Sequence, residues 1–194
     1  MTDQLLNEAI VFAVAQHAGA QHAGATRKGT DIPYIVHPME AAAIAAALTG
    51  DREVMAAAVL HDVVEDTDAT REDVARRFGE RVARLVASDS EDKMPHLSAD
   101  ISWKLRKQAT LTQLDHADED EQIVVLADKL SNLRSLYRDY RTLGDGLWQR
   151  FNQKDKAQHA WYYRTIAEKL TALRGTAPFE EYTELLDRVF PVER

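Results

Sequence analysis

Apolar and polar residues seldom alternate along this chain, so the two-residue pattern of a half-buried strand is rare. Ala, Leu, Glu, Arg and Lys dominate instead, and these residues favour helices. The pattern therefore predicts an all-α fold of about ten helices. The expected helices span residues 3–22, 38–49, 52–66, 71–78, 80–88, 98–116, 119–139, 144–151, 155–173 and 178–190.

The segments between these helices carry start and loop signals. Thr70 is a typical N-cap residue, and Asp73 three residues later is a weak capping-box partner. The stretch Ala87–Asp100 is polar and contains a proline, so we expect a mobile loop there. No linker rich in Gly, Ser or Pro divides the chain, which favours a single domain over residues 1–194.

A short tandem repeat lies at the end of the first expected helix. Residues 16–20 and residues 21–25 both read QHAGA. Because this unit is too short for a solenoid repeat, we interpret it as a local duplication that lengthens the helix end or the loop after it. Its histidines, His17 and His22, are expected to be exposed rather than metal-ligating.

The strongest chemical signal follows an apolar run. Val54–Leu60 leads directly into His61, Asp62, Glu65 and Asp66. Burying several ionisable groups at the end of a core helix costs several kcal/mol unless they are paired or bound to a cation. A divalent metal ion would offset that cost, and His61 and Asp62 offer it an imidazole and a carboxylate. The alternative is a helix end with a solvated acidic turn.

A second polar group begins inside an apolar helix. Asp128, Asn132 and Ser135 fall on one helical face, separate from a stripe of leucines. A narrow polar stripe of this kind is what a pocket-lining helix needs, and the alternative is an amphipathic helix with a solvated polar face. The basic residues outside the stripe are expected to be surface charges: Lys129 and Arg134.

A third candidate is His37, which directly precedes Pro38. A residue before proline favours an extended backbone, and proline suits the first turn of a helix. A single histidine here is more often structural than ligating. Taken together, however, two histidines and two aspartates at or near helix ends suit a six-coordinate cation with open positions for water and phosphate oxygens. Arg27 and Lys28 form a small basic loop that could meet an anion.

Composition narrows the possible functions. The net charge of −8 argues against a general nucleic-acid binder, although local basic residues or a metal can reverse the field inside a pocket. With no cysteine, any metal must be held by nitrogen and oxygen ligands. No apolar run approaches the roughly 20 residues that cross a bilayer, and the N-terminus lacks a signal peptide, so we expect a cytoplasmic protein without a membrane partner.

The order of His37, His61-Asp62 and Asp128 resembles the HD superfamily of metal phosphohydrolases. Longer sequence words narrow the resemblance to the hydrolase domain of the RelA/SpoT group, and most closely to its small, single-domain alarmone hydrolases. These words are RKGTDIPYIVHP, LHDVVEDT, EDK at 91–93, SWKLRKQ, ADKLSNLRSL and WYYRTIAEKL. The resemblance covers about residues 5–172, and the helix at 178–190 lies beyond it.

This resemblance implies hydrolysis of the 3′-pyrophosphate of guanosine 3′,5′-bis(diphosphate), ppGpp, and of its pentaphosphate relative, to GDP or GTP, usually with Mn²⁺. By position, it makes His37, His61, Asp62 and Asp128 the metal ligands, and Glu65 and Asp66 the pair that orients and activates water. The implied substrate contacts are Arg27, Lys28, Asn132, Ser135, Lys104, Arg106, Lys107 and Tyr163.

Two features depart from the family pattern, and two other functions stay open. The QHAGA duplication could shift the Arg27 loop, and the loop at 88–100 is longer than expected. The chain also lacks the length for synthetase and regulatory domains, so we expect a hydrolase only. The alternatives are another phosphate ester, such as NADPH 2′-phosphate or a nucleoside monophosphate, and a catalytically silent nucleotide sensor. The complete ligand pattern argues against the sensor, and the sequence does not indicate an oligomeric state.

Overall fold

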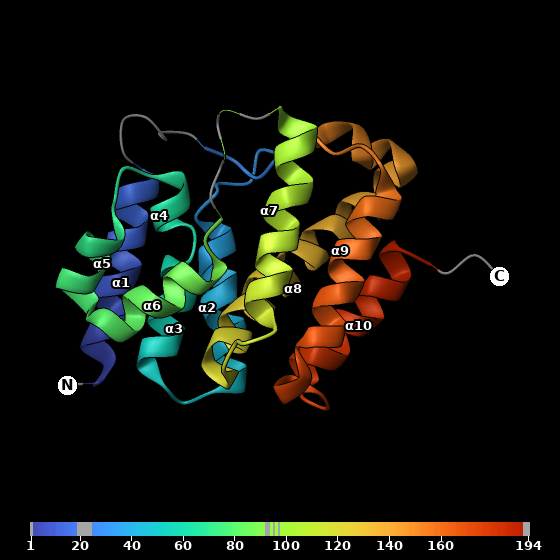
Figure 1. Cartoon of the computed structure of the whole chain (residues 1–194). Helices are drawn as coiled ribbons and strands as arrows, with labels where there is room; N and C mark the ends of the chain where they lie inside the picture. The colour runs from blue at the N-terminus through green and yellow to red at the C-terminus, as the bar shows by residue number, and fades with distance from the viewer. Residues whose placement is uncertain (1, 19–24, 92–93, 95, 97, 192–194) are drawn as a thin grey trace.

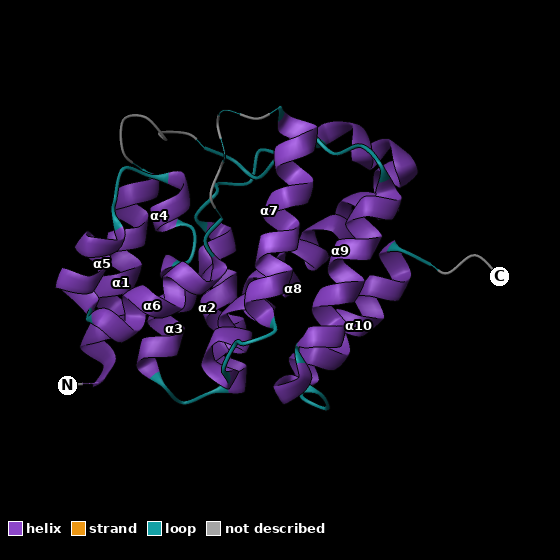
Figure 2. Cartoon of the chain, in the orientation of Figure 1, coloured by secondary structure: helices purple, strands orange, loops and turns teal. Residues whose placement is uncertain are grey.

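The computed structural model describes residues 2–18, 25–91, 94, 96 and 98–191. These residues confirm the all-α class: they form helices, and their only extended pairing is a single bridge between Thr26 and Pro33 (Figure 2). The α-helices are α1 (Thr2–His17), α2 (Val36–Leu48), α3 (Arg52–Leu60), α4 (Val63–Asp66), α5 (Arg71–Phe78), α6 (Glu80–Asp89), α7 (Ala99–Leu114), α8 (Glu119–Leu143), α9 (Lys156–Lys169) and α10 (Ala177–Val189). Two 3₁₀ helices, η1 (Gly144–Arg150) and η2 (Thr171–Leu173), complete the set.

Helix α8 is the central element. It packs against α2, α3, α6 and α10, and Figure 1 shows α1, α5 and α6 on one side of the molecule and α9 and α10 on the other. The stripe of Leu126, Leu130 and Leu133 on α8 is fully buried. Helix α3 is buried on every side, as expected for the continuous apolar run Val54–Leu60. The interior therefore forms around α3 and α8, the two helices that lead to the predicted ligands.

The predicted capping box at the start of α5 is confirmed. The Thr70 side chain accepts from the backbone N–H of Asp73, and the Asp73 side chain accepts from the backbone N–H of Thr70. Helix α8 begins with an equivalent box between Asp118 and Glu121. These reciprocal bonds satisfy N–H groups that have no partner within the helix, so they fix where α5 and α8 begin.

Two local predictions about the histidines were wrong. The helix expected at 52–66 is interrupted between Leu60 and Val63. In a continuous helix the carbonyl of Ala58 would accept from the backbone N–H of residue 62, but here it accepts from the His61 ring. His37 is helical rather than extended, since α2 already begins at Val36. Pro38 then lies in the first turn of α2, where no backbone donor is needed, so the helix tolerates it.

Other helix ends differ from the predictions. α1 ends at His17, which is buried rather than exposed and packs its ring against Tyr34 at a centroid distance of 5.1 Å. His22 lies outside the described residues. The expected loop Ala87–Asp100 is shorter than predicted, since α6 continues to Asp89 and α7 begins at Ala99. The helix expected at 155–173 divides into α9 and η2.

None of the helices in the described part of the chain is long and apolar enough to cross a membrane.

Candidate metal centre and adjoining cleft

Four side chains from three separate segments of the sequence converge beside α8. His37 in α2 and His61 after α3 place their Nε2 atoms 3.2 Å apart. Oδ1 of Asp128, from α8, lies 3.0 Å from Nε2 of His37 and 3.5 Å from Nε2 of His61. Asp62 adds a second carboxylate, with Oδ2 at 3.0 Å from Nε2 of His61 and 3.5 Å from Nε2 of His37.

This donor set fits a divalent metal ion. His37, His61 and Asp128 each offer one donor atom, and the three atoms lie within 4.8 Å of one another. Nitrogen and oxygen ligands bind such ions at about 2.0–2.2 Å, which places neighbouring ligand atoms roughly 3 Å apart. The distances of 3.0–3.5 Å between the imidazole nitrogens and the carboxylate oxygens match that spacing. Asp62 adds a fourth donor, which lies close to both imidazoles.

Hydrogen bonds behind each ring orient its other nitrogen toward the centre. Nδ1 of His61 lies 2.8 Å from the Ala58 carbonyl, which can only accept, so Nδ1 carries a hydrogen. Nδ1 of His37 lies 2.8 Å from Oγ of Ser131, and Ser131 donates its own proton to Glu40 at 2.7 Å. Ser131 must therefore accept from His37. In their neutral forms both imidazoles present the Nε2 lone pair to the centre, which is the form that binds a metal.

The two imidazoles of the centre have pKa values that are shifted in opposite directions. Burial lowers the pKa of His37. Burial also acts to lower the pKa of His61, but the charges of Asp62 and Asp128 raise it well above its usual value. The same carboxylates that hold a proton on His61 would attract a divalent cation, so proton and metal compete for this nitrogen.

Lys129 is part of this centre, and its prediction as a surface charge was wrong. Its side chain is only 9% exposed, and Nζ contacts Oδ2 of Asp128 and, at 3.0 Å, Oδ1 of Asp89. Burial would lower the pKa of Lys129, but the two aspartates raise it well above the usual value, so the amine stays charged. Asp128 thus turns one oxygen to the imidazoles and the other to an ammonium group.

The two acidic residues implied to activate water line the same cavity from α4. Burial, and then the charge of Asp62, raises the pKa of Glu65 to about 7, even though Glu65 accepts a backbone hydrogen bond from Glu91. Asp66 accepts a hydrogen bond from the Tyr34 hydroxyl at 3.1 Å, and the same hydroxyl contacts Asp62. Burial raises the pKa of Tyr34, so its hydroxyl remains a donor at neutral pH.

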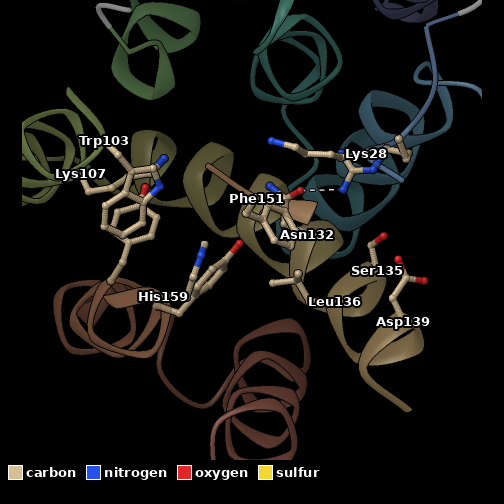
Figure 3. A pocket seen from close by; sticks show the side chains of 12 residues that line it. Lys28, Trp103, Lys107, Asn132, Ser135, Leu136, Asp139, Phe151 and His159 are labelled. Atoms are coloured by element: carbon tan, nitrogen blue, oxygen red, sulfur yellow. Dashed lines mark hydrogen bonds between the residues drawn. The ribbon is translucent and has the colours of Figure 1, made fainter. Parts of the chain in front are cut away.

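Two adjoining cavities of about 200 Å³ each form a cleft. The charged cavity contains the carboxylates and His37. The aromatic cavity is walled by rings from α7, α9 and the segment after η1 and by smaller side chains of α8, and the rings labelled in Figure 3 point inward. These aromatic side chains are Trp103, Phe151, His159, Tyr162 and Tyr163. Arg27, Lys107 and Asn132 line both cavities, so the two are continuous. The charged end of this cleft suits phosphate groups, and the aromatic end suits a flat ring.

Most of the implied substrate contacts lie in this cleft. Arg27 donates to Oδ1 of Asn132 at 2.7 Å, and Asn132 donates to Asp128 at 2.5 Å. Lys28 lies over the Phe151 ring at 5.5 Å from its centroid. Ser135 and Tyr163 line the aromatic cavity (Ser135 is labelled in Figure 3).

The three basic residues expected from α7 do not lie together. Arg106 and Lys107 face the charged cavity, where both pair with Glu91 at 3.2 and 2.7 Å. Lys104 is exposed and lines a separate depression with Ile101, Leu105 and Gln108. The structure therefore does not bring Lys104 to the cleft.

Several residues of the site were not predicted from the sequence. Tyr34 and Lys129 occur inside the recognised words, but no role was assigned to Tyr34, and Lys129 was placed on the surface. No role was assigned to Asp89 or Ser131 either, because their roles depend on contacts between helices. One signal was available: Lys129 follows Asp128 inside an apolar run, where an unpaired charge would be costly.

Comparisons with known proteins agree with this geometry. A family model described as an HD domain matches residues 9–155. Guanosine-3′,5′-bis(diphosphate) 3′-pyrophosphohydrolase MESH1 of Mus musculus is 35% identical over 161 residues, which cover 81% of this chain and 79% of that protein. The Homo sapiens protein of the same name is 41% identical over 138 residues, 70% of each chain.

A solved structure extends the similarity to the fold. It is that of a metazoan orthologue of SpoT that hydrolyses ppGpp and plays a role in starvation responses, and it covers 95% of this chain and 94% of its own. The TM-score is 0.72 and the sequence identity is 29%. The chain therefore belongs to the HD-domain family, in the group of the guanosine-3′,5′-bis(diphosphate) 3′-pyrophosphohydrolases.

Proposed function

We propose that this protein hydrolyses the 3′-pyrophosphate of ppGpp and pppGpp, releasing pyrophosphate and leaving GDP or GTP. The observation that supports this most directly is the cluster of imidazole and carboxylate donors opening into a cleft with a charged and an aromatic end. The relatives that carry this activity in their names support the choice of substrate. We further propose that residues 1–194 form a single hydrolase domain. We also propose that the protein acts in the cytoplasm.

His37, His61, Asp62 and Asp128 would hold one divalent metal ion, for which we propose Mn²⁺. When bound, such an ion lowers the pKa of water and polarises a phosphoryl oxygen. The donors themselves do not select Mn²⁺ over other ions that accept nitrogen and oxygen ligands. Manganese is therefore the part of the proposal that depends on the family resemblance alone.

Glu65 is proposed as the group that positions the attacking water and takes its proton. Without a bound cation, burial and the charge of Asp62 raise its pKa to about 7, and a metal ion on Asp62 would lower that pKa and favour the carboxylate form that a general base needs. Asp66 is proposed to orient the same water, and the Tyr34 hydroxyl fixes the Asp66 carboxylate next to Asp62. Glu65 thus has the protonation range of a base, while Asp66 has the fixed orientation.

The basic residues are proposed to bind the phosphates. Arg27 and Lys107 line both cavities, and Arg106 lines the charged cavity alone. Their charges would stabilise the phosphoryl oxygens as the bond to the 3′ oxygen breaks in an in-line displacement. The nucleoside would then extend into the aromatic cavity, with Lys28, Ser135 and Tyr163 at its walls.

NADPH 2′-phosphate is the second candidate substrate. The centroids of the Trp103 and His159 rings lie 5.4 Å apart in the wall of the aromatic cavity. These two rings offer a surface on which a second flat group of the substrate would stack. For the silent-sensor alternative, no contact in the cleft provides comparable support.

The deciding experiment is anion-exchange analysis of the products from ppGpp, pppGpp, NADPH and a nucleotide panel, with Mn²⁺ and with chelator. We expect pyrophosphate with GDP or GTP, only when metal is present. Turnover of NADPH alone would replace the proposed substrate, and turnover in chelator would remove the metal-dependent mechanism. Mg²⁺ and Zn²⁺ in parallel reactions test the choice of Mn²⁺.

A further inference from the structure

The ammonium group of Lys129 occupies an unusual position beside the metal centre. It is buried in the wall of the charged cavity and contacts Oδ2 of Asp128, the oxygen of that carboxylate that does not face His37. Asp128 therefore bridges two cationic positions, one at the imidazoles and one at Lys129. In two-metal hydrolases, a second metal ion lies about 3.5–4 Å from the first, close enough to share ligands.

Asp89 completes the surroundings of this ammonium group. Its Oδ1 lies 3.0 Å from Nζ of Lys129, and its side chain is 1% exposed. Its Oδ2 is buried and has no hydrogen-bond partner within the described residues. Two buried carboxylates thus face one monovalent cation, with one carboxylate oxygen left over. Carboxylate oxygens completed by water ligands are also a donor set that a divalent ion accepts.

The other acidic residue nearby is engaged elsewhere. Glu91 pairs through Oε1 with Lys107 and through Oε2 with Arg106. The position of Lys129 is therefore defined by Asp89 and Asp128 alone among the acidic side chains that contact it in the described part of the chain.

We propose that Lys129, held by Asp89, stands where a second metal ion would otherwise bind, and so limits the centre to one ion. The inference rests on the metal centre of the proposed function and adds what determines its metal number. Lys129 and Asp89 are then positioning residues, which act on the metal centre through Asp128. Replacing Lys129 by a neutral residue should expose Oδ2 of Asp128 and both oxygens of Asp89 to a second cation.

The test is the number of Mn²⁺ ions bound per chain. Protein stripped with chelator is equilibrated with Mn²⁺, freed of unbound metal and analysed by elemental mass spectrometry and by electron paramagnetic resonance. We expect one ion in the wild type, two spin-coupled ions in Lys129→Ala, and one ion in Lys129→Arg, which restores the charge. The double variant Lys129→Ala/Asp89→Asn should return to one ion, because it lacks the second carboxylate.

Lys107→Ala is the matched control. It also removes a lysine from the charged cavity, but that lysine pairs with Glu91 and not with a ligand carboxylate, so one ion is expected. A single ion in Lys129→Ala, or two coupled ions in the wild type, would overturn the inference. Should Lys129→Ala fail to fold, Lys129→Gln replaces it, and the wild-type spectrum still provides a test. No bound ion in the wild type would instead reject the proposed metal centre itself.

Discussion

The two ends of the cleft are built in different ways. At the charged end the side chains stand on α2, α8 and the turn between α3 and α4, in the interior of the molecule, and each ring and carboxylate is held by specific hydrogen bonds. At the aromatic end the rings come from α7, α9 and the segment after η1 and mainly contact other rings, while α8 contributes smaller side chains to the wall. The Tyr162 hydroxyl there is buried without a hydrogen-bond partner in the described residues.

This difference separates chemistry from recognition. Metal ligation and proton transfer need atoms placed within a few tenths of an ångström, which hydrogen-bonded groups on core helices provide. Stacking on a ring tolerates more variation in position, so peripheral helices are sufficient for it. Substitutions at the charged end should therefore act on metal binding and kcat, and those at the aromatic end on KM.

The largest effect is expected from the ligands. Asp62→Ala and Asp128→Ala should each lose bound metal together with activity, by on the order of 10³-fold or more, since the machinery acts as a unit. Elemental analysis and product formation would be measured on the same samples. Asp187→Asn, an exposed aspartate of α10, is the control and should change neither. A ligand variant that stays active without bound metal would contradict the proposed mechanism.

Glu65→Gln should keep the metal and lower kcat by roughly 10²–10⁴-fold, the usual contribution of a general base. In chelator it should also be more stable than the wild type at high pH. The folded pKa of about 7 exceeds the ordinary glutamate value of 4.5, so ionising Glu65 costs stability as pH rises between them.

The gain in stability from Glu65→Gln should be absent below pH 4.5 and reach at most about 3 kcal/mol above pH 7. Denaturant unfolding at both extremes measures it. An equal gain at both pH values would show that the pKa of Glu65 is not raised in the folded protein.

Ser131→Ala should weaken metal affinity by about 10–100-fold, because it removes the link that orients His37 through Glu40. Metal titration followed by electron paramagnetic resonance would give the affinity. Ser88→Ala removes another buried serine hydroxyl, one that donates to the Leu85 carbonyl, and should leave the affinity unchanged. Equal affinities in the two variants would exclude an orienting role for Ser131.

At the aromatic end, Phe151→Leu should raise KM by roughly 10-fold while leaving metal content unchanged, consistent with the loss of one stacking contact. Steady-state kinetics with ppGpp measures the division between KM and kcat. Phe179→Leu, a buried phenylalanine of α10, is the matched control for the change in size. A fall in kcat without a change in KM would mean that the two ends are not separable.

The smallest effect is expected at Lys104. Lys104→Ala should change KM by less than about 2-fold, whereas Lys107→Ala on the same helix should raise it, because only Lys107 faces the cleft. Kinetics of the two variants side by side would test the orientation of α7. Similar increases in KM for both would show that α7 presents another face to the substrate.

The sequence predicted the charged end better than the aromatic end for a physical reason. His61 and Asp128 each follow an apolar run, so the cost of burying them is visible locally. Lys129 was misplaced because helical periodicity puts it outside the polar stripe, and its partner Asp89 comes from α6. Trp103, Phe151 and His159 resemble ordinary core residues in the sequence, and only the packing of α7, η1 and α9 makes them a cavity wall.

The hydrogen bonds that run from Arg27 through Asn132 to Asp128 connect the two ends directly. A nucleotide that drew the Arg27 guanidinium toward its phosphates would remove the donor to Asn132, the residue that in turn donates to the metal-facing oxygen of Asp128. Binding of substrate and of metal would then be thermodynamically coupled, and any such coupling is reciprocal. In a cell, the fraction of enzyme loaded with metal would vary with the concentration of the nucleotide.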